Sequence, residues 1–274
     1  MRVMIWADME GVAGISTWEH AGDISPLYEE GRRLYTGEVN AAVRGCKKSG
    51  ATEIVVIDGH GGGYKDARGF ISLITDRLEP GANYVLGHAW TRYIEPLEKG
   101  CDAVLFVGAH AMAGTPDGVL SHTVSSESWY NATINGTLVG ESGIVAAIAG
   151  CWNVPGVFVS GDEATCREVR NLLGPTVVTA PVKKGLGRFS ARHLAHTDAC
   201  KLIEERAAEA LANRSSWPQP LTFKPPVAFQ VELATPDRAA PYYGRTGVEV
   251  TGPRTVRSTG VNFWQAWDAF WYRG

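Results

Sequence analysis

The fold is decided by the N-terminal stretch MRVMIWADMEG, residues 1–11 of the 274-residue chain. Val3–Ala7 is a short, uninterrupted apolar run that stops at two acids, Asp8 and Glu10. A strand that is apolar on both faces is typical of a parallel sheet covered by helices on both sides. The stretch therefore predicts a buried central strand with acids at its carboxyl end, the edge at which open α/β sheets bind ligands.

Three later segments repeat this pattern of an apolar run that ends at polar or glycine residues: Glu53–Ile57, Ala103–Val107 and Val157–Val159. Helix-like stretches accompany them: Arg32–Ser49, Ser142–Cys151, Glu163–Leu173 and Asp198–Asn213. This alternation of strands and helices favours right-handed crossovers between parallel strands. We therefore expect a three-layer α/β sandwich with a mostly parallel central sheet.

A proline-rich segment, Trp217-Pro-Gln-Pro followed by Lys224-Pro-Pro, interrupts the alternation. Beyond it, Val227–Leu233 alternates like a strand, Val248–Val256 carries β-branched residues, and Phe263–Tyr272 has the pattern of an aromatic-rich helix. We predict an α/β catalytic domain over residues 1–215. Residues 216–274 are expected to form a smaller C-terminal α+β extension that packs on the same domain.

Composition excludes several classes of function. The net charge is −3, and Lys and Arg form no basic stripe, so nucleic acid is not an expected partner. No apolar run reaches the roughly 18 residues that a membrane helix needs, and the N-terminus does not have the pattern of a secretion signal. The five cysteines are far apart and contain no C-x-x-C pair. We expect a cytoplasmic protein that binds neither nucleic acid nor membrane.

Residues suited to binding metal follow three of the predicted strands. Asp8 and Glu10 have the i, i+2 spacing that puts both carboxylates on one face of an extended chain. Asp58 and His60 repeat this spacing after the second strand, and His110 follows the third. Nitrogen and oxygen donors together suit zinc, and a carboxylate that bridges suits two ions about 3.5–4 Å apart.

Each of these signals has an ordinary alternative when it is taken alone. The two acids could be solvated in a loop, and the glycine-rich stretch after Asp58 could cradle a phosphate, although it lacks the Walker lysine. A histidine such as His110 often serves only as a hydrogen-bonded structural residue. The convergence of three strand ends favours a metal site over these alternatives.

Five separated motifs occur in an order that resembles a known family. They are Asp8-Met-Glu-Gly, Asp58-Gly-His60, Gly-Ala-His110-Ala-Met-Ala-Gly-Thr-Pro, Leu120-Ser-His122 and Val139-Gly-Glu141. Together they are similar to the D-aminopeptidase DppA family of zinc metallopeptidases, peptidase family M55. The resemblance runs over nearly the whole chain and includes Thr251-Gly-Pro-Arg-Thr-Val near its end.

The resemblance implies a metal centre with assigned roles. Asp8 would bridge two zinc ions, Glu10 and His60 would complete one site, and His110 and Glu141 would complete the other. Manganese or cobalt would also accept these nitrogen and oxygen donors. His122 would be the catalytic residue, which we interpret as a proton shuttle or oxyanion stabiliser in preference to a nucleophile. Asp58 is expected to orient His60 or a neighbouring ligand.

The resemblance also implies an activity and an assembly. The expected reaction is hydrolysis of the N-terminal amide bond of short peptides, including peptides with D-amino acids, by a hydroxide that bridges the metals. Self-association into a homo-oligomer, in the form of a decameric ring, is expected, with the C-terminal helix as a candidate contact. The alternatives are a non-peptide amidase or phosphoesterase with the same two metals, or a binding protein without catalysis.

Lys183 and Lys184 are expected to be ordinary surface lysines.

Overall fold

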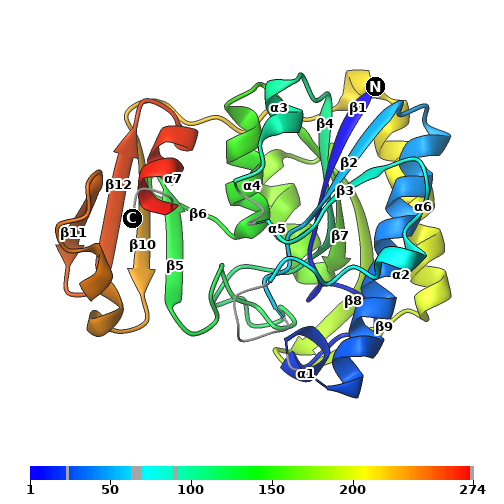
Figure 1. The fold of residues 1–274 in the computed structure, drawn as a ribbon, viewed down its shortest axis with the longest axis horizontal. Helices are drawn as coiled ribbons and strands as arrows, with labels where there is room; N and C mark the ends of the chain where they lie inside the picture. The colour runs from blue at the N-terminus through cyan, green and yellow to red at the C-terminus, as the bar shows by residue number, and fades with distance from the viewer. Residues whose placement is uncertain (23–24, 63–68, 89–91, 272–274) are drawn as a thin grey trace.

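The computed structural model describes residues 1–22, 25–62, 69–88 and 92–271, and two β-sheets organise it (Figure 1). The first sheet contains β1 (Arg2–Ala7), β2 (Glu53–Asp58), β3 (Asn83–Val85), β4 (Ala103–Ala109), β7 (Gly156–Asp162), β8 (Val178–Gly187) and β9 (Ser190–His193). Their order is β3-β2-β1-β4-β7-β8-β9, and every neighbouring pair is parallel except β8 and β9. The predicted, mostly parallel central sheet is therefore confirmed.

Helices cover both faces of this sheet and complete the predicted three layers (Figure 1). One face carries α2 (Pro26–Lys48) and α6 (His196–Ala212), and the other carries α3 (Glu95–Glu98), α4 (Glu141–Gly150) and α5 (Glu163–Leu173). Side chains of β1 alternate between these layers: Ile5 is in the core with α2 and α6, and Trp6 in the core with α4 and α5. This double burial explains why the strand is apolar throughout.

The sequence located most elements to within a few residues, and local chemistry accounts for one larger difference. Helix α2 begins at Pro26, six residues before the predicted start at Arg32. The Ser25 hydroxyl caps the helix by accepting a hydrogen bond from the Tyr28 N–H at 3.1 Å, and Pro26 occupies the first turn, where no N–H is needed. Helix α5 has the predicted ends at both termini.

The second sheet is antiparallel and has the order β11-β12-β10-β5-β6. Its strands are β5 (Trp129–Ile134), β6 (Thr137–Leu138), β10 (Val227–Leu233), β11 (Val248–Gly252) and β12 (Thr255–Gly260). Helix α7 (Phe263–Trp271) packs on it; Tyr272, where the predicted helix ends, lies outside the described residues. The segment Val248–Val256, which is rich in β-branched residues, is folded into a hairpin by a turn after Gly252.

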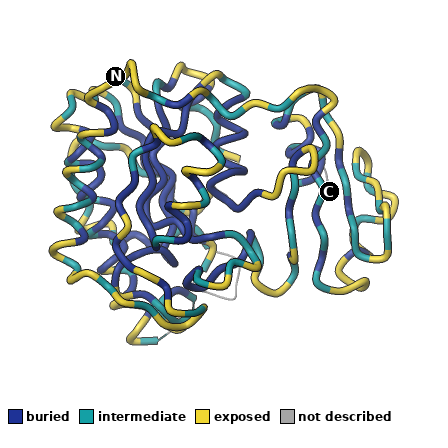
Figure 2. Tube along the Cα trace, turned by 180° about the vertical axis from the view of Figure 1, so that it is seen from behind, coloured by how far each residue is buried: buried dark blue, intermediate teal, exposed yellow. Residues whose placement is uncertain are grey.

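Strands β5 and β6 come from the part of the chain before residue 216, although they pair with a sheet that otherwise follows it. The boundary at residue 215 stays a prediction. Figure 2 shows buried residues, in dark blue, in both sheets, and one hydrophobic cluster joins α4 to α7 and β10.

The remaining helical segments are α1 (Trp18–Ala21), η1 (Thr75–Arg77), η2 (Arg214–Ser216) and η3 (Pro236–Tyr242). No helix within the described ranges is long and apolar enough to cross a membrane.

The chain segments after β1 and β4 approach each other closely enough to require glycine. A Cβ on Gly11 would lie 1.9 Å from the Ala109 carbonyl oxygen, and one on Gly108, whose φ is +68°, would lie 2.1 Å from the Asp8 carbonyl oxygen. Hydrogen bonds from the Asp8 N–H to the Val107 carbonyl and from the Gly11 N–H to the Gly108 carbonyl, both 2.8 Å, join the segments. Backbone contacts therefore set how close the two strand ends lie.

A buried lysine holds the loop that follows Glu10. Lys183 is 3% exposed, and its Nζ donates hydrogen bonds to the carbonyl oxygens of Glu10, Val12 and Ile15 at 2.5, 2.9 and 2.7 Å. The expectation that Lys183 lies on the surface was wrong, because three carbonyls replace its hydration. Lys184 is exposed, as expected, and lies 3.8 Å from Glu163.

Glu38 on α2 supports the same loop from the other side. Its Oε1 accepts a hydrogen bond from the Ala13 N–H at 2.8 Å, and its buried Oε2 has no hydrogen-bond partner among the described residues. Burial, opposed by the Ala13 hydrogen bond and the charge of Lys183, raises the pKa of Glu38 to about 8. The carboxyl group therefore keeps its proton at neutral pH.

We expect the stability of the protein to depend on this proton. The folded-state pKa of Glu38 is raised, so its contribution is full below the unfolded pKa of about 4.3 and is lost as the pH rises towards 8. Glu38→Gln keeps the acceptor and the shape but does not titrate. The free energy of unfolding of Glu38→Gln minus that of the wild type, both measured in urea, should increase by roughly 3–4 kcal/mol from about pH 5 to about pH 8. A difference that is constant with pH would contradict a protonated Glu38.

Candidate metal centre

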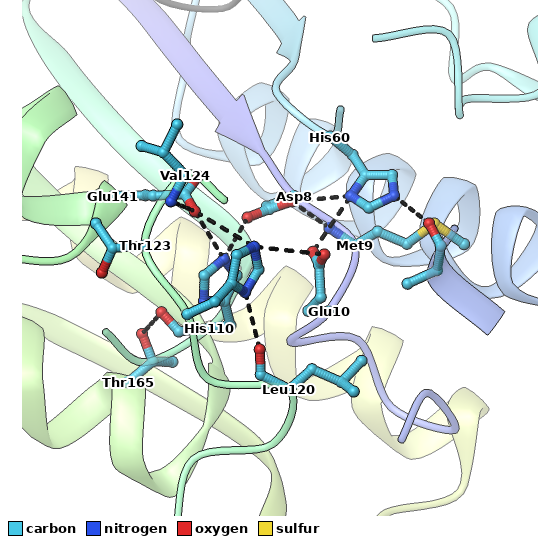
Figure 3. Close-up of polar contacts among 12 residues, drawn as sticks. Asp8, Met9, Glu10, His60, His110, Leu120, Thr123, Val124, Glu141 and Thr165 are labelled. Carbon is cyan, nitrogen blue, oxygen red and sulfur yellow. Dashed lines mark hydrogen bonds and ion pairs between the residues drawn. The ribbon is translucent and has the colours of Figure 1, made fainter. Parts of the chain in front are cut away.

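The six residues predicted as metal ligands and proton carrier lie together at the carboxyl edge of the first sheet. They are Asp8 and Glu10 after β1, His60 after β2, His110 after β4, His122 in the following loop and Glu141 at the first position of α4. Figure 3 shows the five predicted metal ligands. None is more than 9% exposed. Strands β2 and β4 lie on opposite sides of β1, so the cluster occupies the point where the strand order reverses.

The Asp8 carboxylate lies between two imidazoles that come from different strands. Its Oδ1 is 3.3 Å from Nδ1 of His60, and its Oδ2 is 3.3 Å from Nε2 of His110. The same His60 nitrogen is 3.2 Å from Oε2 of Glu10, and the same His110 nitrogen is 3.1 Å from Oε1 of Glu141. Two groups of three donor atoms therefore share one carboxylate.

Backbone carbonyls determine which nitrogen of each imidazole faces the carboxylates. Nε2 of His60 contacts the carbonyl oxygen of Ala21, and Nδ1 of His110 is 3.0 Å from the carbonyl oxygen of Ala111. Because a carbonyl only accepts hydrogen bonds, these nitrogens carry protons, and in a neutral ring the opposite nitrogen would point its lone pair at carboxylate oxygens. Lone pairs that face one another in this way are a suitable cage for a cation.

Unpartnered polar atoms support the same conclusion. The buried atoms Asp8 Oδ2, Glu10 Oε2 and His110 Nε2 have no hydrogen-bond partner among the described residues. Buried polar atoms almost always have a partner, and these three belong to one cluster. A divalent metal with imidazole and carboxylate ligands would satisfy all of them, so the residues fit zinc.

Distance alone groups the donors somewhat differently. Asp8, Glu10 and His110 offer atoms within 4.8 Å of one another, and so do His110, His122 and Glu141. These two sets overlap in His110 and leave out His60. We prefer the division around Asp8, because it follows the directions in which the imidazole lone pairs point.

The charges in the cluster shift its pKa values strongly. Burial raises the pKa of Asp8, but His110 and His60 outweigh it and hold that pKa well below its ordinary value. Burial lowers the pKa of His60 and of His110, but the carboxylates facing each ring outweigh it and raise both values. Without metal the imidazoles would take up protons, and metal binding would release them.

Asp58 contacts the backbone of His60 and not its ring. Its Oδ1 accepts hydrogen bonds from the Tyr35 hydroxyl at 3.0 Å and the His60 N–H at 3.3 Å, and its Oδ2 accepts one from the Leu73 N–H at 3.0 Å. The side chain is fully buried. It therefore fixes the main chain that carries His60, which is compatible with the orienting role expected of it.

His122 lies beside the paired donors. Its Nδ1 donates to the Leu120 carbonyl at 2.8 Å, and its Nε2 is 3.7 Å from Glu141 Oε1 and 4.0 Å from Glu10 Oε1. Its ring stacks on His110 with a centroid distance of 4.0 Å and an interplanar angle of 11°. Burial and the neighbouring charge of His110 lower the pKa of His122, so a neutral ring is available to accept a proton.

A cavity of about 370 Å³ opens onto this cluster. Asp8, Glu10, His60, His122 and Glu141 line it together with residues that the sequence did not single out. These are the apolar rings of Trp18, Phe70 and Trp271 and the carboxylate of Glu127, among others. Aromatic residues carry no local signal for a pocket, and only the tertiary fold brings these segments to the site.

Comparison with known proteins agrees with this arrangement. A family model described as D-aminopeptidase, peptidase family M55, matches residues 1–272. A D-aminopeptidase from Bacillus subtilis (strain 168) is 31% identical over 273 residues, which cover 98% of this chain and 95% of the relative. One similar solved structure is the zinc-dependent D-aminopeptidase DppA from Bacillus subtilis, which is described as a self-compartmentalizing protease. It superposes on this chain with a TM-score of 0.89 at 31% sequence identity, and the match covers 98% of this chain and 95% of that one. The chain belongs to the D-aminopeptidase family, peptidase family M55.

Proposed function

We propose that this protein is a zinc-dependent aminopeptidase that hydrolyses the N-terminal amide bond of short peptides, including peptides with a D-amino acid at the N-terminus. The observation that carries the proposal is the Asp8 carboxylate, which turns one oxygen to His60 and the other to His110. The names of the relatives support it, since they describe D-aminopeptidases and, for the solved structure, zinc dependence.

In this proposal the chain would hold two zinc ions with Asp8 as the shared ligand. Glu10 and His60 would complete one site, and His110 and Glu141 would complete the other. When bound, the ions would supply Lewis-acid chemistry, which makes a water molecule more acidic and polarises the scissile carbonyl. The Glu141 carboxylate is already oriented, because its Oε1 accepts a hydrogen bond from the Val124 N–H at 2.8 Å.

The chain's own residues would position the substrate and move protons. The His122 ring is neutral, and its Nε2, directed towards the carboxylates of Glu10 and Glu141, would take a proton from the attacking water and pass it to the leaving amine. The Trp18 ring meets His122 edge-on, with a centroid distance of 5.4 Å, and would limit the access of bulk water to that proton.

The cavity lining argues against a phosphoesterase. Among the described residues that line it are four carboxylates, Asp8, Glu10, Glu127 and Glu141, and no lysine or arginine. Three of these carboxylates are proposed metal ligands, so Glu127 would remain without a metal and would repel a phosphate ester. A peptide with a free amine suits these charges better.

A substrate panel together with metal analysis tests the proposal. The purified protein is assayed with D-Ala p-nitroanilide, L-Ala p-nitroanilide and p-nitrophenyl phosphate, and its zinc is measured by elemental analysis. We expect about two zinc ions per chain and turnover of an alanyl anilide that is lost with a chelator and restored by zinc. Turnover of the phosphate ester alone, or full activity in protein that contains no divalent metal, would contradict the proposal.

We also propose that the protein is cytoplasmic and assembles with copies of itself. All five cysteines are free, which suits a reducing compartment. The relative with a solved structure is described as self-compartmentalizing. The decameric ring stays a prediction, which the native mass of the purified protein would test.

A further inference from the structure

A second cavity lies beside the metal centre, and its charge differs from that of the first. It has a volume of about 410 Å³ and shares His122 and Ser126 with the first cavity. Among the described residues, no aspartate or glutamate lines it, whereas Arg188 does. His122 therefore stands between a cavity rich in carboxylates and a cavity with a cation.

The contacts of Arg188 fix it close to His122. Its Nε is 3.3 Å from the carbonyl oxygen of Ser121, the residue before His122, and its own carbonyl accepts a hydrogen bond from the Leu120 N–H at 2.8 Å. The guanidinium carbon lies 5.7 Å from the centroid of the Trp18 ring, which forms a T-shaped pair with the His122 ring. Trp18 thus contacts both residues.

Among the described residues, none forms a hydrogen bond or ion pair with the terminal nitrogens of Arg188. The guanidinium also lies 5.4 Å from the centroid of the Phe189 ring, so aromatic rings orient the group without using its N–H donors. No carboxylate of the described residues lies within ion-pair distance of it. An arginine oriented in this way presents the paired donors that match a carboxylate.

We propose that Arg188 binds the C-terminal carboxylate of a dipeptide whose amide bond is cleaved at the metal centre. This inference rests on the proposed aminopeptidase function and names its substrate class. A dipeptide with its scissile bond beside His122 would extend its second residue into the cavity of about 410 Å³. Its amine end would remain in the first cavity, where Glu127 is a further carboxylate.

A matched pair of substrates tests this carboxylate site. D-alanylglycine and D-alanylglycinamide differ only in the terminal charge. We expect the wild-type enzyme to favour the free acid by about tenfold or more in kcat/KM, and Arg188→Gln to lose most of this preference. Arg188→Lys should keep part of it, because the charge remains while the paired donors are lost. Added salt should reduce the wild-type preference, since Arg188 is exposed.

Arg192→Gln is the control variant. Arg192 is an exposed arginine on β9, in the same hairpin, and it lines a different cavity. It should keep the wild-type preference and rates. An equal loss on both peptides in Arg188→Gln would assign Arg188 to holding the His122 loop and would overturn the proposal.

D-Ala p-nitroanilide, which lacks a carboxylate, separates this proposal from the function it rests on. A wild-type enzyme that cleaves the anilide but does not distinguish the two peptides overturns the carboxylate site alone. An enzyme that cleaves none of the three overturns the proposed function and the carboxylate site together.

Discussion

Replacing Asp8 by asparagine is expected to remove most of the bound zinc and to lower kcat/KM by at least about 1,000-fold. Both oxygens of Asp8 face an imidazole lone pair, one on His60 and one on His110. Asparagine has the same shape, but it carries no negative charge, and its amide nitrogen is a donor that cannot bind a metal. The measurements are elemental analysis of dialysed protein and the rate with D-Ala p-nitroanilide.

Asp198→Asn is the matched control, because Asp198 is an exposed carboxylate in the first turn of α6. This variant should keep the zinc content and the rate of the wild type. If Asp8→Asn retained two zinc ions with wild-type affinity, Asp8 would have no place between the metals, and the division of the ligands into two groups would fail.

The second large effect is expected for His122→Gln, which should keep its zinc and lose about 100- to 10,000-fold in kcat on alanine amides. The ring is held neutral because burial and His110 lower its pKa, and once protonated it would give up its proton readily. If it passes this proton to the leaving amine, the loss should be smaller for D-Ala p-nitroanilide than for D-alaninamide. The weakly basic p-nitroaniline needs less help from a proton donor.

The comparison of the two leaving groups also distinguishes the other roles of His122. Equal losses on the amide and the anilide would support a nucleophile or an oxyanion stabiliser in place of a proton donor. Loss of zinc would indicate that His122 supports the metal ligands. Thermal unfolding of the zinc-loaded variant is the control for folding.

Much of the site was predictable because its residues follow buried strands directly. The apolar run Val3–Ala7 and the acids behind it placed Asp8 and Glu10 at the sheet edge, and the same pattern placed His60 and His110. Parallel strands bring their carboxyl ends together, so residues distant in sequence could be expected to meet. Glu141 and His122 follow no strand of this sheet, and only the family resemblance pointed to them.

The remainder depends on contacts that leave no periodic signal. Strand β5 pairs with β10, about a hundred residues later in the chain, and nothing in the sequence of β5 identifies β10 as the strand it pairs with. Lysine usually lies on the protein surface, and Lys183 is buried because the loop that follows Glu10 turns three carbonyls towards it. The hairpin of β11 and β12 was missed because β-branched residues lie on both sides of the turn at Pro253.

The carbonyls that hold His60, His110 and His122 have a consequence for how this enzyme can change. Each ring is anchored to main-chain oxygen, from Ala21, Ala111 and Leu120, and every amino acid supplies that oxygen. Substitution at the three anchoring positions therefore leaves the tautomers in place, provided that the backbone keeps its course. Metal preference is then free to evolve through the carboxylates, and substrate choice through the cavity walls, while the nitrogen donors stay constant.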